Sequence, residues 1–273
     1  MGLPSIVRGA PKGAALPSSG VGIPASLELC ETRRMDGATN VYSRPEVVDH
    51  YRTSIELQPA EAELFAQYVH PNDRVLDLGI GAGRTTRYLA DRQVYVGLDI
   101  VELMVATAKQ DLNENRLLVA SADRLPFREG AFDFVVFSFN GIDSLPTREE
   151  VYAEVGRVLG PGGTFLFSVH NARLITSVPP LAVRGLLAWL SGLPSELIRA
   201  AFSKRTWFGH GELKVHGSKL RGLRVSCCSR RRIVAALRAH GFEIMRTVSA
   251  PFPGRPSALT PWYYYAAQAH QLP

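Results

Sequence analysis

Three aspartates and a cluster of glycines stand at the ends of consecutive predicted strands, where they could hold a ligand. Asp77 lies two residues before Gly79 in the run 75–83 (VLDLGIGAG), Asp99 follows the second strand, and Asp123 follows the third. Glycines let the backbone approach a ligand closely, and the free N–H groups of a following helix favour polar or anionic ligand atoms. A carboxylate after the second strand can accept hydrogen bonds from both hydroxyls of a ribose. Together these residues predict a nucleoside-binding site.

Two details of the glycine run narrow the class of ligand. A dinucleotide-binding run has Gly or Ala five residues after its first glycine, and here Arg84 occupies that position. Asp77 would repel a pyrophosphate, but it suits an ammonium group. A nicotinamide-dependent oxidoreductase is therefore disfavoured. Each aspartate alone could equally be a turn residue or a helix cap, so it is the set of three that favours a ligand site.

Alternating strand-like and helix-like runs must position these residues. The predicted strands are 74–78, 94–98, 117–120, 132–137, 163–169, 242–248 and 262–267. The predicted helices are 45–51, with Ser43 as its cap, 59–69, 84–90, 101–110, 148–159 and 230–240. Strands that alternate with helices predict a parallel sheet with right-handed crossovers.

The regular alternation stops at His170, and about fifty residues follow that fit no simple strand–helix unit. Apolar helical runs are expected at 181–190 and 196–202, and a loop rich in Gly and Lys at 209–223. Such an insertion could cover a hydrophobic substrate or pack onto the domain's own core. The expected parts of the chain are a flexible tail (1–40), a ligand-binding core (41–171), a cap insertion (172–225) and the C-terminal part of the core sheet (226–273).

Charge is divided unevenly along the chain. The 273 residues carry 31 Lys and Arg against 25 Asp and Glu, a net charge of 31 − 25 = +6. Residues 1–171 contribute 16 − 22 = −6, and residues 172–273 contribute 15 − 3 = +12. The basic part is either a solvated Arg-rich surface or a feature that attracts a substrate with an acidic group. The composition excludes collagen-like, wholly disordered and disulfide-scaffold proteins.

The cysteines and the apolar runs of the chain indicate the cellular compartment in which the protein is expected. The chain has 3 Cys, of which Cys227 and Cys228 are adjacent, and they match neither an even disulfide framework nor a zinc-binding spacing. We therefore expect a reduced, cytoplasmic protein without a metal. The start of the chain lacks a secretory or myristoylation signal, and the most apolar stretch, 179–202, is too interrupted to span a bilayer.

Five runs match, in order, the successive motifs of a known family: VLDLGIGAGRTT, VGLDI, SADRLPF, FDFVVFSFN and RVLGPGGTFLFSVHN. Over roughly residues 45–171 the chain resembles the class I S-adenosylmethionine-dependent methyltransferases (a methyltransferase type 11/25-like domain), with weaker support over 230–267. The resemblance implies an α/β, Rossmann-like sheet of seven strands, with the last strand antiparallel and helices on both faces. It implies S-adenosyl-L-methionine as cofactor and S-adenosyl-L-homocysteine as product.

The resemblance also implies roles for the residues that hold the methionine and the ribose. Gly79, Gly81 and Gly83 would pass beneath the methionine moiety. Asp77 would lie near its ammonium group, and Asp99 would bind the ribose.

At the other end of the cofactor, the resemblance places Ile100 and Met104 beside the adenine. Asp123 would accept a hydrogen bond from the adenine amino group, flanked by Ala122 and Arg124. The remaining candidates for cofactor contact are Tyr51, with Tyr42 as the alternative, and Phe139.

Candidate catalytic residues stand at the ends of the fourth and fifth strands, the edge at which ligands gather in open α/β sheets. Because the sulfonium is already activated, the protein mainly has to exclude water and align the acceptor, and a base helps where the acceptor is a hydroxyl. His170 is the candidate base, because imidazole titrates near neutrality, and a structural His at a loop is the alternative. Asp143 and Asn140 are further candidates. Asn140 precedes Gly-Ile rather than Pro-Pro-Phe/Tyr, which argues against nucleobase amino groups.

We therefore expect a methyltransferase that acts on an oxygen, or less often a nitrogen, of a small molecule such as a specialised metabolite. If the basic C-terminal part attracts the acceptor, the acceptor bears an acidic group. We expect no nucleic acid partner, and we expect a monomer or a homodimer. One alternative is an RNA methyltransferase that uses the basic C-terminal region, although no RNA-binding module is visible. Another is a non-catalytic partner subunit with the same fold, against which the glycine run and Asp99 argue.

Overall fold

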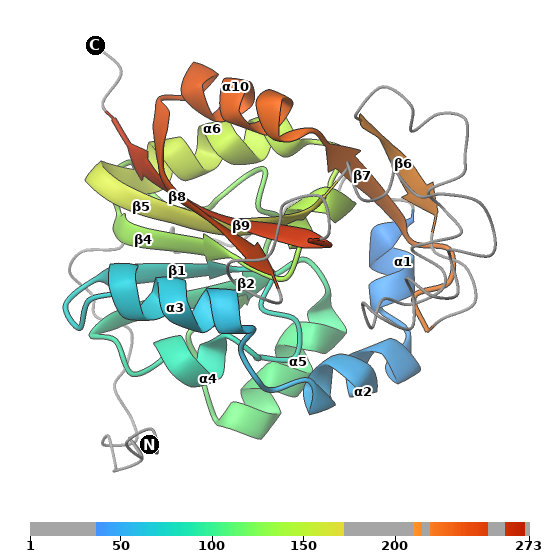
Figure 1. Ribbon diagram of the computed structural model, residues 1–273. Helices are drawn as coiled ribbons and strands as arrows, with labels where there is room; N and C mark the ends of the chain where they lie inside the picture. The colour runs from blue at the N-terminus through green and yellow to red at the C-terminus, as the bar shows by residue number, and fades with distance from the viewer. Residues whose placement is uncertain (1–36, 172–209, 215–218, 251–259, 271–273) are drawn as a thin grey trace, which may run out of the picture.

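The computed structural model describes residues 37–171, 210–214, 219–250 and 260–270 (Figure 1). The expected tail, apart from 37–40, and the apolar runs at 181–190 and 196–202 lie outside the described residues. Within the described part, no helix is long and apolar enough to cross a membrane.

A sheet of seven strands forms the centre of the molecule, in the order β3-β2-β1-β4-β5-β9-β8. These strands are β1 (Arg74–Leu78), β2 (Val94–Asp99), β3 (Leu117–Val119), β4 (Phe132–Phe137), β5 (Leu159–His170), β8 (Phe242–Ala250) and β9 (Trp262–Ala269). The first five pair in parallel, and β9 runs antiparallel to both of its neighbours, β5 and β8. The predicted seven-stranded sheet with an antiparallel last strand is confirmed.

Helices cover both faces of this sheet (Figure 1). They are α1 (Ala38–Tyr42), α2 (Pro45–Thr53), α3 (Pro59–Tyr68), α4 (Thr86–Leu89), α5 (Glu102–Leu112), α6 (Arg148–Val158) and α10 (Arg230–Ala239), with a short 3-10 turn η1 (Gly141–Ser144) after β4. The apolar residues of α3 and α5 pack on one face, and those of α6 and α10 pack on the other. Each helix buries one apolar stripe against strands that are themselves buried on both faces, as parallel strands require.

A separate ribbon of two antiparallel strands, β6 (His210–Lys214) and β7 (Arg224–Cys228), lies beside the main sheet (Figure 1). The expectation of a loop over 209–223 is therefore wrong at β6. Pairing with β7 makes this segment a strand, and that pairing partner is not visible in the local sequence.

Two other local expectations are wrong. Ser43 does not cap α2, because its backbone is helical and ends α1, whereas Arg44 takes the extended backbone favoured before a proline and precedes the helix. The helix expected to begin at Arg84 begins only at Thr86. The positive φ of Gly83 (87°) prolongs the preceding turn and delays the helix.

Candidate active site

The glycine loop joins β1 to α4 at the carboxyl edge of the sheet. Gly79, Gly81 and Gly83 all have positive φ (65°, 54° and 87°), a backbone region that L side chains rarely adopt. A Cβ at Gly79 would lie 2.6 Å from the Phe137 ring, and one at Gly83 would lie 2.6 Å from Leu112. At Gly81 the nearest atom is 3.8 Å away, on the Tyr51 ring. Two glycines therefore permit packing, while the third leaves open space in front of the loop.

Asp99 ends β2 directly beside this loop. Its Oδ2 accepts a hydrogen bond from Gly81 N, and its Oδ1 accepts one from Val101 N, both at 2.9 Å. Burial raises the pKa of the Asp99 carboxyl, and the backbone N–H donors oppose that shift. A carboxylate offers about four lone-pair sites, so Asp99 can still accept from a ligand.

Asp77 lies behind the glycine loop and is fully buried. Thr85 and Tyr95 donate their hydroxyl hydrogens to its Oδ2 at 2.7 and 2.9 Å, and its Oδ1 has no hydrogen-bond partner. Burial raises the pKa of the Asp77 carboxyl to about 7, against the opposing effect of these two hydrogen bonds. Asp77 is therefore a buried acid with one oxygen left to accept a hydrogen bond.

A cavity opens in front of the glycine loop, between the ends of β2 and β4 and helices α1 and α2, and the empty space there, with its open mouth included, is about 950 Å³. Eight of the twelve predicted cofactor residues line it: Tyr51, Gly79, Gly81, Asp99, Ile100, Met104, Ala122 and Phe139. Asp77, Gly83, Asp123 and Arg124 are not among its lining residues. The cavity thus combines one buried carboxylate with a largely apolar wall, the usual make-up of a small-molecule site.

Helices α1 and α2 cover this cavity with aromatic rings. The rings of Tyr42 and Tyr51 meet edge to face at 5.9 Å, and the Tyr51 ring meets that of Phe139 at 6.5 Å. The Tyr42 hydroxyl lies 3.2 Å from Ser144 Oγ, across the cavity. Both tyrosines that the sequence offered as a cover therefore line the cavity.

Asp123 is engaged by its own neighbours at the far end of the cavity. Ser121 Oγ donates to its Oδ1 at 2.5 Å, and Thr147 Oγ1 donates to its Oδ2 at 2.7 Å. Ser121 and Ala122 line the cavity and Asp123 does not. Its predicted contact with an adenine amino group stays a prediction.

A buried ion pair that the sequence analysis missed supports the inner wall. Arg84 lines the cavity and donates to both carboxylate oxygens of Glu61, at 2.5 and 2.8 Å. Ser138 Oγ hydrogen-bonds to the same carboxylate and lies 3.3 Å from the Tyr264 hydroxyl. The Arg84 guanidinium also lies 4.8 Å from the centre of the Phe139 ring. A signal for Glu61 existed in the sequence, because helical spacing places it on the same face as Leu64 and Phe65.

The backbone after β4 is strained. Phe139 and Asn140 both have positive φ, 56° and 61°, at a typical cost of about 1–3 kcal/mol per residue. Ser168 Oγ accepts a hydrogen bond from Asn140 N at 2.7 Å, which fixes this turn. The Asn140 side chain is buried, and its Oδ1 has no partner. Strain of this kind is typical of functional sites.

The candidate base His170 is held by Asp143. Asp143 Oδ2 accepts hydrogen bonds from His170 N at 2.6 Å and lies 2.7 Å from His170 Nδ1. Neither residue lines the cavity, nor does Asn140, but Gly141 and Ser144 of the same 3-10 turn do. The turn η1 therefore borders the cavity with Gly141 and Ser144, while its Asp143 bonds to His170 away from the cavity lining. In the described part of the chain, no three His, Cys, Asp or Glu side chains are grouped to hold a metal.

Comparison with known proteins points to the same chemistry as this geometry. A model of the methyltransferase domain family matches residues 76–167. A demethylmenaquinone methyltransferase of Mycolicibacterium vanbaalenii is 32% identical over 157 residues, which cover 54% of this chain and 67% of the relative. The chain belongs to the class I S-adenosylmethionine-dependent methyltransferases.

Other relatives of this methyltransferase differ in the substrates that their names give. A malonyl-[acyl-carrier protein] O-methyltransferase of Geobacter sulfurreducens is 38% identical over 114 residues, 40% of this chain and 42% of the relative. A crystal structure of the Burkholderia thailandensis 1,6-didemethyltoxoflavin-N1-methyltransferase, with bound S-adenosylhomocysteine, shares the fold at a TM-score of 0.55, with 19% identity and 85% of each chain covered. The chain spans 42% of the length of this Geobacter relative and 56% of that of an uncharacterized methyltransferase of Synechocystis sp.. S-adenosylmethionine is the cofactor of the family to which the chain belongs.

Proposed function

We propose that this protein transfers a methyl group from S-adenosylmethionine to an oxygen, or less often a nitrogen, of a small molecule such as a specialised metabolite. The observation that carries the proposal is the cavity that joins Gly81 and Asp99 to the aromatic cover formed by Tyr42 and Tyr51. A covered, mostly apolar cavity excludes water, which methyl transfer requires. The named relatives that act on small or carrier-bound acceptors support this class of substrate.

The cofactor fits the cavity as follows. Asp99 accepts the ribose hydroxyls with the lone pairs that Gly81 and Val101 leave unused. Asp77 faces the ammonium group from behind the glycine loop, through its unpartnered Oδ1. Other contacts come from the lining residues Tyr51, Gly79, Ile100, Met104, Ala122 and Phe139. Gly83, Asp123 and Arg124 complete the proposed set, although they do not line the cavity.

His170 accepts the proton of the acceptor in this proposal. Asp143 accepts from Nδ1–H, which leaves the lone pair of the imidazole at Nε2. When bound, the cofactor supplies a methyl group on a positively charged sulfur, and that sulfur becomes a neutral thioether when the methyl carbon bonds to a lone pair of the acceptor. The proton released from the acceptor then bonds to His170 Nε2, so charge and atoms balance. Asn140, with its unpartnered amide oxygen, orients the acceptor.

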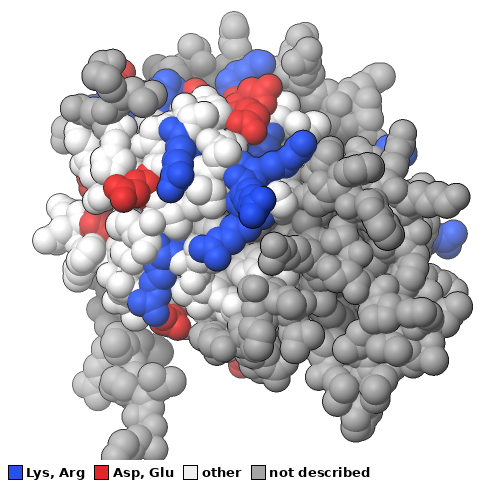
Figure 2. All heavy atoms as spheres, turned by 45° about the horizontal axis from the view of Figure 1, so that its top comes forward, with Lys and Arg blue, Asp and Glu red and all other residues white. Residues whose placement is uncertain are grey.

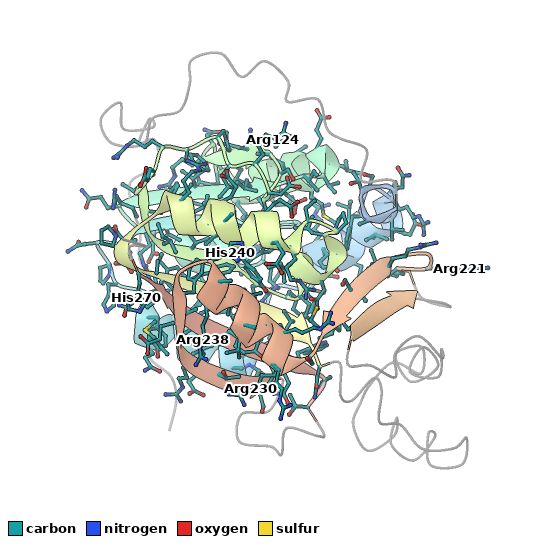
Figure 3. All side chains as sticks on the ribbon, turned by 90° about the horizontal axis from the view of Figure 1, so that it is seen from above. Arg124, Arg221, Arg230, Arg238, His240 and His270 are labelled. Carbon is teal, nitrogen blue, oxygen red and sulfur yellow. The ribbon has the colours of Figure 1, made fainter. Side chains whose placement is uncertain are left out.

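Among the described residues, the basic side chains on the face that carries α10 are mixed with acidic ones, which supports a small acceptor rather than RNA. Figure 2 shows Lys and Arg side chains on the face that carries α10, with acidic side chains among them. In Figure 3, Arg230 and Arg238 extend from α10, whereas Arg221 lies at the far end of the ribbon. Within this face His240 lies 3.5 Å from Glu149 of α6. A polyanion is best bound by one continuous basic surface, so these residues favour at most an acidic group on a small acceptor.

Calorimetric titration with S-adenosylhomocysteine tests the proposed site. We expect the wild-type protein to bind, Asp99→Ala to weaken binding at least about tenfold because both ribose hydrogen bonds are lost, and Asp91→Ala to leave binding unchanged. Asp91 is a matched control, since its carboxylate is largely exposed and does not line the cavity. Absence of binding by the wild type would refute the proposal.

The acceptor class is tested with a labelled methyl donor. A cell extract is incubated with the protein, and the label is measured separately in the small-molecule, RNA and protein fractions. We expect label in small molecules. Label in RNA alone would favour the RNA alternative, and an absence of label in every fraction despite cofactor binding would favour a non-catalytic subunit.

A further inference from the structure

Arg148 of α6 lies at the centre of a chain of hydrogen bonds that ends at His170. Its Nη2 donates to Asp143 Oδ1 at 2.5 Å and to the main-chain oxygen of Ser226 in β7 at 2.7 Å. The other oxygen of Asp143 binds the main chain and ring of His170. One buried guanidinium therefore connects the β6–β7 ribbon to the candidate base through a single carboxylate.

The Arg148 side chain makes few hydrogen bonds for a buried, charged group. Only 10% of it is exposed, and its Nε and Nη1 are buried without any hydrogen-bond partner. Burying a charge with unsatisfied donors is costly, so packing alone would favour an apolar residue here. The two contacts that Arg148 does make point to a role for its charge at Asp143.

The other titratable groups around Asp143 cannot replace this charge. Cys227 and Cys228 of β7 and Tyr152 of α6 face Arg148 and Asp143. Burial raises the pKa of the Cys227 thiol and of the Tyr152 phenol, so both are neutral at physiological pH. Tyr265 of β9 is neutral for the same reason, with Arg230 and Tyr263 among its charged and polar neighbours.

An ionised Asp143 determines which ring nitrogen of His170 carries the proton. A carboxylate only accepts hydrogen bonds, so it requires Nδ1–H and leaves Nε2 free, whereas a protonated carboxyl could donate to Nδ1 instead. A buried carboxylate stays ionised when a cation is bonded to it. Arg148 supplies that cation on the side of Asp143 opposite His170.

We propose that Arg148 is a positioning residue that fixes His170 as its Nδ1–H tautomer, and that the Ser226 carbonyl of the ribbon holds Arg148 in place to do so. The proposal rests on the proposed function for its consequence in catalysis, because only this tautomer leaves Nε2 able to take a proton. The tautomer itself is a property of the free protein. It can be measured without knowledge of the acceptor.

The test is nitrogen NMR of the full-length protein labelled at histidine, at a pH where imidazole is neutral, with His170→Asn identifying the signals. We expect wild-type His170 to carry its proton on Nδ1. Arg148→Met and Arg148→Gln should shift the ring toward the Nε2–H form, because Asp143 loses its cation. Arg148→Lys should preserve the wild-type tautomer, because the charge is retained.

Arg157→Met is the matched control. Arg157 also lies on α6, and it also bonds to a carboxylate, that of Glu154, and to main-chain oxygens, those of Leu125 and Phe127. Its removal should leave the His170 signals unchanged. An Nε2–H tautomer in the wild type would overturn the proposal even if no Arg148 variant folds, and so would an unchanged tautomer in folded Arg148→Met or Arg148→Gln. Titration with S-adenosylhomocysteine tests the proposed function separately from the proposal for Arg148, since Arg148 does not line the cavity.

Discussion

Asp77→Asn should change how the stability of the protein depends on pH. The pKa of the Asp77 carboxyl is raised from its ordinary value of 3.8 to about 7 in the folded protein, chiefly by burial. The folded state then binds a proton that the unfolded state releases, so the stabilising contribution is complete below about pH 4 and is lost as the pH rises toward 7. A shift of this size corresponds to about 4 kcal/mol of unfolding free energy.

The effect appears as a difference between two urea unfolding series. The unfolding free energy of the wild type, minus that of Asp77→Asn, should fall by about 4 kcal/mol between pH 4 and pH 8, because the asparagine cannot ionise. Asparagine keeps the shape of the side chain and an oxygen that accepts from Thr85 and Tyr95. The packing around residue 77 is therefore preserved at every pH, and only the ionisation is removed.

Asp133→Asn serves as a control of opposite sign. Hydrogen bonds from Arg74 lower the pKa of the Asp133 carboxyl, so its contribution is present above its unfolded pKa and is lost as the pH falls. The unfolding free energy of the wild type, minus that of this variant, should therefore stay nearly constant from pH 4 to pH 8 and fall only below about pH 4. If the unfolding free energy of the wild type, minus that of Asp77→Asn, stays constant from pH 4 to pH 8, then Asp77 is not a buried, proton-binding acid.

Two further predictions concern the wall and the floor of the cavity. Glu61→Gln should lower the unfolding free energy by about 3–5 kcal/mol, because it leaves the buried Arg84 without a counter-charge. The control Glu63→Gln, in an exposed ion pair, should cost less than about 1 kcal/mol. Equal urea midpoints for the two variants would refute this prediction. Gly81→Ala should weaken S-adenosylhomocysteine binding in calorimetry about tenfold, since the new methyl group enters the open space in front of the loop, where the nearest protein atom is 3.8 Å away on Tyr51. Unchanged affinity would mean that the loop does not touch the cofactor.

Local sequence was sufficient for most of the central sheet. The strands at 74–78 and 132–137 are found at their predicted bounds, because each is a short apolar run bounded by polar or glycine residues. The glycine loop was equally predictable, because positive φ demands a particular residue type at a particular place. Local patterns failed where a distant partner decides the structure, as at β6, whose strand exists by pairing with β7.

The sequence by itself determined the fold class and predicted most of the residues at the cavity, because their signals are carried by neighbouring residues: the glycines after β1 and the aspartate that ends β2. Only the tertiary structure decided which polar side chains meet. Glu61 and Arg84 are separated by 23 positions, Asp143 and His170 by 27, and Arg148 and Ser226 by 78. Asp143 meets His170 because β4 and β5 run parallel and end at one edge of the sheet, whereas the other two contacts depend on how α3, α6 and the β6–β7 ribbon pack near that edge. No local pattern encodes that convergence.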